Sequence, residues 1–549
     1  MSVIRTLRTI RHLRPVQIVG QVRNRLRPRW EKPAQFAARP IPAFGGVAWP
    51  ETVSFLAPGA QGNKSASLCE GQFTFVNDSR TLGWPPAEWQ APDAPKLWQY
   101  NLHYFEWLWA LDYPTARTVL LDWIARHPLK RGHVGWEPYP TSLRLMNWCA
   151  LCFGPFRAAL EKDTETCDAL WQSIHVQAEW LCAHLETHLL GNHLFENGAA
   201  LAFVGSAFPG KAATRWKQTG LDILRREIPE QILPDGMHFE RAPMYHVRMT
   251  YLMKLLCDTG DPALIEGISE ARQRMEQALV ALCHPDGEIA LFNDSAFGIY
   301  STPEALVDCA AAPAGPWSLP DAGYFGWRGE DGTYLICDAG QIGPNYIPGH
   351  AHGDLFSYEL SIKGARVIVD SGVYDYVPSA MRNYCRSTAA HNTVTIENQD
   401  QSEFWGAFRV ARRAYPRDVQ WQVEGDTCRL SGCHTGYQRL PGQPTHHREF
   451  AWTAGEGLTV RDVVRATRAV QSVSRVHLHP QCRVKLTGSH EAQVDFAAGS
   501  CRISFTGAGS LALEDTHYCP EFGKQETNVT LAFTLEGKES EATYTVVPN

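Results

Sequence analysis

Two histidines one residue apart stand at the start of the segment that carries most of the chain's reactive side chains. In "IPGHAHGDLFSYEL" (347–360), His350 and His352 occupy a glycine-punctuated loop before an alternating apolar pattern typical of a β-strand. If the loop is locally extended, residues two apart point the same way, so both imidazoles face one side. Imidazole is both an acid–base group near neutral pH and a common metal ligand. The pair therefore predicts a catalytic site or a metal-binding site.

Two further candidate metal ligands lie at the ends of neighbouring predicted strands. Asp370 follows the apolar run in "ARVIVDSG", and His391 opens "HNTVTIEN". We expect these two residues and His352 to meet where three strands of one sheet end. Two neutral imidazoles and one carboxylate, with a coordination position left open, suit a zinc ion. The alternative is that Asp370 caps a turn and the histidines are ordinary loop residues.

A second group of polar residues interrupts two apolar segments nearer the N-terminus. The segments are "LLGNHLFENGAAL" (189–201) and "GMHFERAPMYHVRMTYLMKLL" (236–256), and the polar residues are Asn192, His193, Glu196, Asn197, Tyr245 and His246. In a helix, His193 and Glu196 share a face, because residues three apart are neighbours. These groups either face a cleft or form an internal hydrogen-bond network that satisfies helix ends.

The elements that position these residues change character once along the chain. From about residue 95 to 315, apolar residues recur every three or four positions, which predicts stacked antiparallel helices over 104–127, 170–190, 216–233 and 268–285. After residue 332 the period becomes two, and turn residues divide many short strands. We therefore expect an α+β multidomain chain with a basic segment over 1–35, a lead-in over 36–94, a helical domain over 95–318 and a layered antiparallel β-sandwich over 319–549.

Composition excludes some classes of function and favours one compartment. A length of 549 residues implies two or three domains, and a net charge of −7 argues against general nucleic-acid binding. The 15 cysteines lack the spacing of a disulfide framework. We interpret them as reduced core thiols, which favours a cytoplasmic location.

The N-terminus is strongly basic and apolar at once. Residues 1–30 hold eight arginines and no acid, and Ile4, Leu7, Ile10 and Leu13 recur three apart between the arginines. The chain shows neither the apolar core of a standard signal peptide nor a run long enough to span a bilayer. We expect a basic amphipathic helix that contacts an anionic partner, either the inner membrane surface or an anionic polymer. The alternative is a helix that docks on its own protein with solvated arginines.

The motifs in combination resemble one known family. The sequences "NHLFENG", "MYH", "GHAHGDLFSYEL", "VIVDSGVYDY" and "AAHNTV" are similar, in this order, to motifs of the heparinase II/III-like polysaccharide lyases. The resemblance covers the chain from about residue 95 to its end. The segment 387–414 looks like members encoded among bacterial exopolysaccharide genes. This resemblance implies an α/α toroid followed by a C-terminal antiparallel β-sandwich.

The resemblance also implies a role for each candidate residue. Asn192 and His193 would bind a uronate carboxylate, Tyr245 would be the catalytic acid or base, and His350 would be a second catalytic histidine. Either His193 or His350 could be the base. The metal would be a structural zinc held by His352, Asp370 and His391. Further contacts to an acidic polysaccharide are expected from Glu196, Asn197, His246, Arg144 and Arg386, the arginines because a guanidinium matches a carboxylate.

The implied activity is β-elimination on a uronic-acid-containing polysaccharide. A base removes the C5 proton, the oxygen on C4 leaves, and a 4,5-unsaturated uronate remains, provided that donors neutralise the substrate carboxylate. Free tyrosine titrates near pH ~10, so Tyr245 needs cationic neighbours to act as a base. Two other functions share these residues or this fold: a uronyl C5-epimerase on a similar polymer, and a non-catalytic glycan-binding protein of exopolysaccharide biosynthesis.

Overall fold

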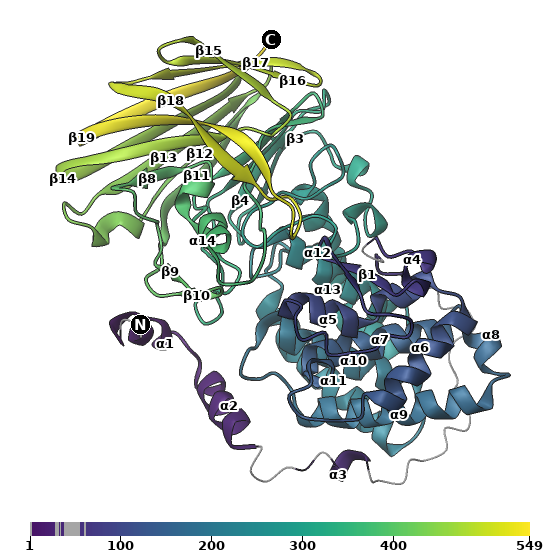
Figure 1. Cartoon of the computed structure of the whole chain (residues 1–549). Helices are drawn as coiled ribbons and strands as arrows, with labels where there is room; N and C mark the ends of the chain where they lie inside the picture. Colours follow the sequence, from purple (N-terminus) through teal and green to yellow (C-terminus); the bar gives the residue numbers. More distant parts are fainter. Residues whose placement is uncertain (1–2, 28–31, 33, 38–54, 60–61) are drawn as a thin grey trace.

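The computed structural model describes residues 3–27, 32, 34–37, 55–59 and 62–549. One part of the chain is helical, and the following part is made of antiparallel sheets (Figure 1). The expectation of an α+β multidomain chain is therefore confirmed. The change from helix to strand falls between α13 (Pro262–Leu282) and β3 (Gly315–Leu319). Residues 38–54 and 60–61 of the expected lead-in over 36–94 lie outside the described residues.

Long helices that share a buried apolar core make up the helical part. They are α5 (Lys96–Tyr104), α6 (Tyr113–Arg126), α7 (Pro138–Phe153), α9 (Thr164–Ala183), α10 (Gly191–Ala207), α11 (Lys211–Gln231), α12 (Pro243–Cys257) and α13, with the shorter α3 (Ala34–Ala37), α4 (Ser65–Cys69) and α8 (Arg157–Leu160). Asp112, Asp163 and Asp261 begin three of them. Each carboxylate accepts a hydrogen bond of 3.0–3.1 Å from a backbone N–H in the first turn.

Two predicted helices differ from the structure in their extent. The stretch 104–127 is broken at Phe105, which adopts a left-handed conformation with φ 61° between α5 and a short 3₁₀ turn (Glu106–Ala110). This break puts the Phe105 ring in the core, with its centroid 5.2 Å from that of Trp107 and 5.3 Å from that of Trp148. The helix predicted over 170–190 ends at Ala183. Tertiary packing overrides the helical period at both places.

A five-stranded antiparallel sheet lies between the helices and the second sheet. Its order is β3-β4-β5-β6-β7, with β4 (Tyr324–Arg328), β5 (Tyr334–Asp338), β6 (Tyr358–Ile362) and β7 (Ala365–Ile368). Alternate residues of β5 face opposite sides, because side chains alternate along a strand. Tyr334 and Ile336 pack with Leu282 of α13, whereas Leu335 packs with Phe450 of the second sheet. Both faces of this sheet are therefore covered.

The second sheet is larger and forms the outer layer. Its order is β11-β12-β13-β14-β19-β17-β16-β15, with β18 paired to β19 and β8 paired to β14. The strands are β8 (Val394–Ile396), β11 (Pro416–Glu424), β12 (Thr427–His434), β13 (Thr445–Thr453), β14 (Gly457–His477), β15 (Arg483–Gly488), β16 (Glu491–Phe496), β17 (Gly499–Thr506), β18 (Gly509–Tyr518) and β19 (Glu526–Pro548). Strand β14 is 21 residues long, so this part of the chain does not follow the prediction of short strands only. Two short hairpins, β1 (Gln72–Phe75) with β2 (Asp78–Thr81) and β9 (Phe404–Trp405) with β10 (Arg409–Val410), and the helix α14 (Ala380–Arg386) complete the elements.

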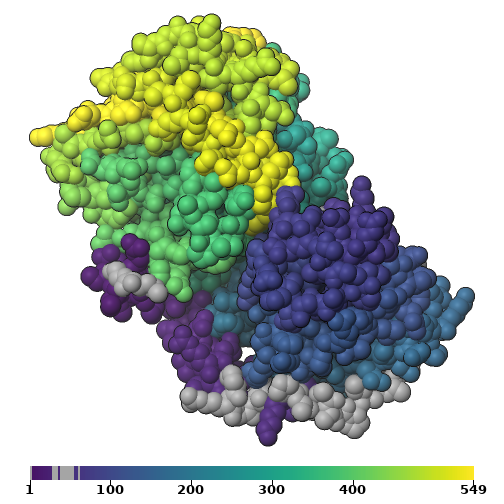
Figure 2. All heavy atoms as spheres, viewed as in Figure 1, coloured from purple at the N-terminus to yellow at the C-terminus, as the bar shows by residue number. Residues whose placement is uncertain are grey.

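The N-terminal helices α1 (Val3–Ile10) and α2 (Pro15–Leu26) lie on the outside of the molecule, where they contact both parts of the chain (Figures 1 and 2). On α1, Arg8 forms an ion pair with Glu403 at 3.4 Å, close to the β9–β10 hairpin. On α2, the side chain of Gln17 donates a hydrogen bond of 3.2 Å to the backbone carbonyl of Tyr346. Within the described residues, no helix has the length and apolar composition needed to span a membrane.

Candidate active site and metal centre

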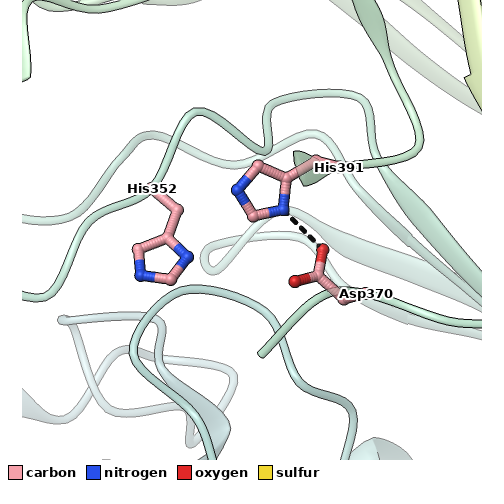
Figure 3. A group of neighbouring side chains, drawn as sticks. All are labelled: His352, Asp370 and His391. Atoms are coloured by element: carbon pink, nitrogen blue, oxygen red, sulfur yellow. Dashed lines mark hydrogen bonds and ion pairs between the residues drawn. The ribbon is translucent and has the colours of Figure 1, made fainter. Parts of the chain in front are cut away.

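Three buried side chains from the sheet region lie close together, and Figure 3 shows how they are arranged. His352, Asp370 and His391 each offer one ligand atom, and these atoms all lie within 4.8 Å of one another. The Nδ1 atom of His391 lies 2.7 Å from Oδ2 of Asp370. All three side chains have no exposed surface. The group predicted from strand ends is therefore assembled in the fold.

The polar atoms that this group leaves without partners fit a metal ion. Nδ1 of His352 and Nε2 of His391 are buried and have no hydrogen-bond partner in the described residues. Such atoms are unfavourable unless a ligand satisfies them. The other nitrogen of His352, Nε2, lies 2.8 Å from Oδ1 of Asp294. A carboxylate in this position orients an imidazole toward a metal. The donor set of two imidazoles and one carboxylate is compatible with zinc.

The two histidines of this group differ in protonation. Burial lowers the pKa of His352 to about 3, so that ring is neutral, which is the form that binds a metal. Burial alone would also lower the pKa of His391, but the adjacent charge of Asp370 outweighs it and raises the pKa to about 9. Binding of a cation at His391 therefore displaces a proton.

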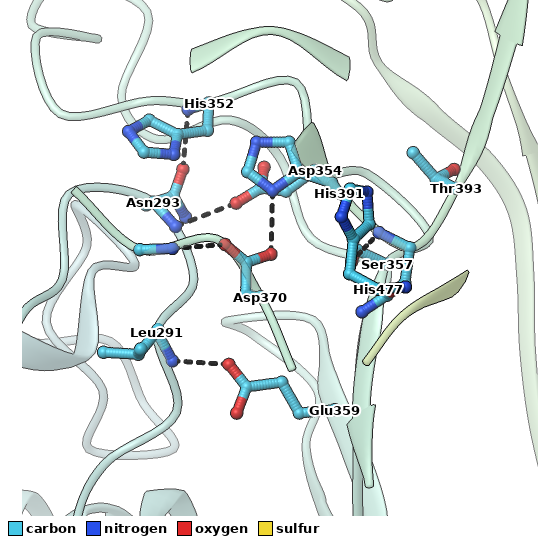
Figure 4. A network of polar contacts seen from close by, with 12 residues as sticks. Leu291, Asn293, His352, Asp354, Ser357, Glu359, Asp370, His391, Thr393 and His477 are labelled. Atoms are coloured by element: carbon cyan, nitrogen blue, oxygen red, sulfur yellow. Dashed lines mark hydrogen bonds and ion pairs between the residues drawn. The ribbon is translucent and has the colours of Figure 1, made fainter. Parts of the chain in front are cut away.

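One detail of the prediction for this group is wrong. His352 precedes β6 and Asp370 follows β7, which are neighbours in the five-stranded sheet, but His391 precedes β8, which pairs with β14 of the larger sheet. The group therefore lies between two sheets. The polar network around it appears in Figure 4, where Asn293 accepts a hydrogen bond of 3.0 Å from the backbone N–H of His352 and donates its own backbone N–H to Asp354 at 2.9 Å.

The loop that carries His352 also places His350 against the helical part. The ring of His350 stacks on that of Tyr245, near the start of α12, with centroids 3.9 Å apart and planes at 17°. The hydroxyl of Tyr245 lies 2.9 Å from the hydroxyl of Tyr376. Burial first, and then the neighbouring Tyr376 and Tyr300, raise the pKa of Tyr245 well above its usual value. Tyr245 therefore carries its proton at neutral pH.

Glu240 connects this stacked pair to helix α10. One carboxylate oxygen of Glu240 accepts a hydrogen bond from Nδ1 of His350, and the other lies 3.4 Å from the backbone nitrogen of Asn192. Burial alone would raise the pKa of Glu240, but the charge of His350 and these hydrogen bonds outweigh it and lower the pKa. Gly191 allows this approach, because a Cβ there would come within 2.9 Å of the carboxylate. The carboxylate therefore orients His350 and leaves its Nε2 atom to exchange protons.

The start of α10 presents two donors. The side-chain amide of Asn192 makes no hydrogen bond to the part of the chain that the structure describes. Nδ1 of His193 lies 3.0 Å from Oε1 of Glu186, and its ring contacts that of Tyr139 in a tilted arrangement, with centroids 4.5 Å apart and planes at 41°. Burial alone would lower the pKa of His193, but the charge of Glu186 and the hydrogen bond to it raise the pKa. A protonated His193 and a free amide are suitable donors to an anion.

Comparison with known proteins identifies the family of the chain. The model of the heparinase II/III N-terminus matches residues 112–302, and the model of the heparinase II/III-like C-terminal domain matches residues 311–547. The chain belongs to the heparinase II/III-like family. The resemblance carried by the sequence motifs is therefore confirmed.

Individual members of this family share moderate identity with the chain. A heparin-sulfate lyase of Pedobacter heparinus is 26% identical over 422 residues, which cover 68% of this chain and 60% of the relative. A heparin-sulfate lyase of Bacteroides stercoris is 28% identical over 289 residues, covering 46% of this chain and 40% of the relative. The chain thus matches between two fifths and three fifths of the length of these relatives.

Solved structures of the family share the fold. A heparinase III structure superimposes with a TM-score of 0.72 at 18% identity, covering 94% of this chain and 88% of the other. The heparan sulfate lyase of Pedobacter heparinus superimposes with a TM-score of 0.59 at 19% identity, covering 94% and 87% of the two chains. At this level of identity the similarity establishes the arrangement of elements.

Five residues expected to contact substrate lie inside the heparinase II/III-like fold instead. Each is buried, and apart from Nη2 of Arg386, which has no hydrogen-bond partner among the described residues, its polar groups bond to other parts of the protein. Arg144 donates to the side chain of Gln177 and to a backbone carbonyl, and Arg386 donates to backbone carbonyls. Neither guanidinium is available to an external anion. The expectation of direct substrate contact is therefore corrected for both arginines.

The other three residues have the same kind of environment. Glu196 accepts two hydrogen bonds from Arg248, at 2.6 and 3.2 Å, in a fully buried ion pair. Asn197 bonds to Glu186 and Ser142, and His246 bonds to backbone groups through both ring nitrogens. These side chains form the internal network that was the alternative interpretation. Through Glu186, Asn197 also positions His193.

Sequence reasoning missed the carboxylates that hold these groups in place. Glu240 lies in "MHFERAPMYH", only five residues before Tyr245, so a search for acids near that motif could have found it. Asp294 lies in "LFNDS", accepts from His352 and forms a fully buried ion pair with Arg382. No local pattern indicates the role of Asp294, because its partners are 58 and 88 residues away.

Proposed function

We propose that the protein is a polysaccharide lyase that cleaves an acidic, uronate-containing polysaccharide by β-elimination. The observation that carries this proposal is the stack of His350 on Tyr245, with Glu240 oriented behind His350. The named lyases among its relatives support the same class of reaction. In this reaction a base removes the proton on C5, the C5–H electrons form the C4–C5 double bond, and the oxygen on C4 leaves with a proton.

The two ring groups have different properties, which suggests how the roles divide. Tyr245 keeps its proton because burial raises its pKa, so we assign it the role of acid toward the leaving oxygen. His350 presents Nε2 while Glu240 holds Nδ1, an arrangement that favours acceptance of a proton at Nε2. We therefore assign His350 as the base. When His350 accepts the proton, its ring becomes positively charged, and the carboxylate of Glu240 stabilises that charge.

The start of α10 supplies the remaining requirement of the reaction. A uronate carboxylate must be neutralised before the C5 proton becomes acidic enough to remove. Asn192 has a free amide, and the raised pKa of His193 favours its protonated form. We assign both as donors to the substrate carboxylate. Because its raised pKa favours the protonated form, His193 is not available to accept the C5 proton, which favours His350 for that role.

We propose that His352, Asp370 and His391 hold a zinc ion with a structural role. The ion would satisfy the two buried imidazole nitrogens that otherwise have no partner and would fix the loop between two sheets. Because His350 lies two residues from His352, a fixed loop also keeps His350 stacked on Tyr245. The same proposal extends to the architecture: the helices form an α/α toroid, and the two sheets form a β-sandwich.

The test is the ultraviolet absorbance of the unsaturated uronate, with purified protein and a panel of acidic polysaccharides that includes heparan sulfate. We expect absorbance to rise with at least one polymer and the Tyr245→Phe variant to lose the activity. The matched control is Tyr251→Phe, since Tyr251 lies on the same helix and is equally buried, with 5% exposed surface for both residues. Tyr251 donates to the carbonyl of Leu56, away from His350.

Two results would contradict the proposal. Absorbance that rises equally with wild type and Tyr245→Phe would remove Tyr245 from the reaction. No rise with any polymer, together with exchange of the C5 proton in deuterated water, would assign the epimerase activity instead. Elemental analysis of the purified protein tests the metal separately, and protein without any bound transition metal would exclude the zinc site.

A further inference from the structure

The two N-terminal helices expose apolar side chains to an extent that the rest of the described chain does not. Eight of the fifteen exposed large apolar residues in the described ranges fall within residues 3–22. They are Val3, Ile4, Leu7, Ile10, Val16, Ile18, Val19 and Val22. The other seven are distributed singly over almost five hundred residues. A concentration of this kind marks a contact surface.

On α2 the usual orientation of an amphipathic helix is reversed. The side that faces the protein is small and polar: Gln17 and Gly20 are buried, and Gln17 donates to Tyr346. Gly20 lies so close to His188 that a Cβ would approach its side chain within 2.8 Å. Val19 and Val22 lie about half a turn away on a helix of about 3.6 residues per turn, and both point to solvent. An internal helix would place these valines against the core.

The first helix, α1, shows the same reversal. Thr9 faces the protein, where its hydroxyl lies 3.4 Å from the backbone carbonyl of Val410 and accepts a hydrogen bond of 3.1 Å from Trp405. Leu7 and Ile10 lie on the other side of the helix and are exposed. Both helices are thus fixed to the protein by polar contacts, and their large apolar side chains are exposed.

Positive charge surrounds this apolar surface. Arg8 and Arg14 are held in ion pairs by Glu403 and Glu230. Arg5, Arg23 and Arg25 are exposed and form no ion pair with any described residue. Residues 1–30 contain no acid that could neutralise them. An apolar side bordered by arginines is the pattern of a helix that lies in the interface of an anionic membrane.

We propose that α1 and α2 form a docking face for a membrane that contains anionic phospholipid. Arginines alone would also suit an acidic glycan, but aliphatic side chains gain nothing from a hydrated polymer, whereas they are stabilised on transfer to the acyl region. The inference does not depend on the proposed function. It turns one expectation from the sequence into a specific surface, with polar contacts to the protein and apolar contacts to lipid on opposite sides.

Docking at this face would bring the lipid surface close to the candidate active site. The guanidinium of Arg14 lies 3.7 Å from the ring centroid of Tyr346, which precedes His350 by four residues. The β9–β10 hairpin contacts α1, and Phe408 lies in the turn between its two strands. The ring centroid of Phe408 lies 6.4 Å from that of His350. The N-terminal segment therefore contacts both the loop that carries His350 and the β9–β10 hairpin that lies beside His350.

The experiment measures co-sedimentation of the full-length protein with vesicles of phosphatidylcholine, with and without about 30% phosphatidylglycerol. We expect binding to the anionic vesicles and much weaker binding to phosphatidylcholine alone. The variant Leu7→Ser/Val19→Ser/Val22→Ser should bind about tenfold more weakly or worse, since it removes apolar contacts. Arg5→Gln/Arg23→Gln/Arg25→Gln should lose binding to anionic vesicles by about fivefold per arginine and show little dependence on salt.

The matched control is Val423→Ser/Leu513→Ser, which removes exposed apolar side chains from β11 and β18 without touching the docking face. Its vesicle binding should equal that of wild type. The proposal is overturned if wild type ignores both kinds of vesicle, or if the triple serine variant binds as wild type does. It is also overturned if the helices bind only heparin beads, or if they mediate self-association without vesicle binding. Melting temperatures should agree among the variants, because the changed side chains are exposed.

Discussion

Replacing Glu240 with glutamine should remove most of the activity while leaving the fold in place. The wild-type carboxylate accepts two hydrogen bonds at once, from Nδ1 of His350 and from the backbone N–H of Asn192. Glutamine keeps the size of the side chain but has one acceptor and one donor. If its oxygen stays with Asn192, its amide group faces His350 and forces the ring proton onto Nε2, the atom that must accept the C5 proton. If its oxygen faces His350, its amide N–H faces the backbone N–H of Asn192, and these two donors cannot bond to each other.

The magnitude follows from these two orientations. A hydrogen bond to a charged group is worth about 1.5–3 kcal/mol and a neutral one about 0.5–1.5 kcal/mol, so the lost charge alone accounts for roughly tenfold. The wrong tautomer of His350 adds the loss of general base catalysis, worth about 10²–10⁴-fold. We therefore expect kcat to fall by about 10²-fold or more. KM should change much less, because Glu240 lies behind His350 and has only 4% exposed surface.

The assay compares kcat and KM for wild type, Glu240→Gln and the control Glu230→Gln. Glu230 also contacts the loop before His350, since it accepts a hydrogen bond of 2.6 Å from Tyr346, but it touches neither His350 nor Asn192. The control should keep wild-type kcat. The reasoning fails if Glu240→Gln keeps kcat within about threefold, because a base positioned by Glu240 could not tolerate that change. A parallel loss of bound metal would instead indicate that the whole loop had moved.

Three further results are expected. His391→Ala should lose bound metal and melt at a lower temperature, as judged by elemental analysis and thermal unfolding; retention of metal would exclude this ligand set. Arg382→Ala leaves the carboxylate of Asp294 buried without its partner and should lower the free energy of unfolding by about 3–5 kcal/mol, measured by denaturant titration; a change below about 1 kcal/mol would contradict the structural role of the pair. Burial alone would raise the pKa of Asp462, but the charge of Arg448 outweighs it and the pKa is lowered, so its stabilisation is present above about pH 3.9 and is lost as the pH falls further. Unfolding of Asp462→Asn should therefore depend less on pH between about 5 and 2 than that of wild type, and equal slopes would show that this pair does not set the acid limit.

Local periodicity determined a large share of the architecture and part of the site. The change of period from helix to strand near residue 320 separates the helices from the sheets, because apolar spacing reports which side of an element is covered. The same reasoning put His352, Asp370 and His391 at strand ends, where they do converge. Periodicity could not show that His391 precedes a strand of the second sheet, because it locates a strand along the chain but does not say with which other strands it pairs.

Only the tertiary structure decided which polar residues are available to a ligand. The sequence predicted anion contacts for Arg144 and Arg386, but the fold buries both. Arg144 donates to the side-chain oxygen of Gln177 and Arg386 to the carbonyl of Ala351, because amide and carbonyl oxygens also accept from a guanidinium. Glu240 had no such signal, yet it joins His350 and Asn192 across 110 and 48 residues of sequence.

The orientation of the N-terminal helices also depends on the tertiary structure. Their basic and apolar residues are visible in the sequence, as are the two alternatives of membrane contact and docking on the protein. Hydrophobic spacing defines an apolar side but not the surface that covers it. The contacts of Gln17 and Thr9 decide that the polar sides face the protein and leave Val19 and Leu7 outward. The composition of a segment is thus a property of the sequence, whereas its orientation depends on the partners that the complete fold brings to it.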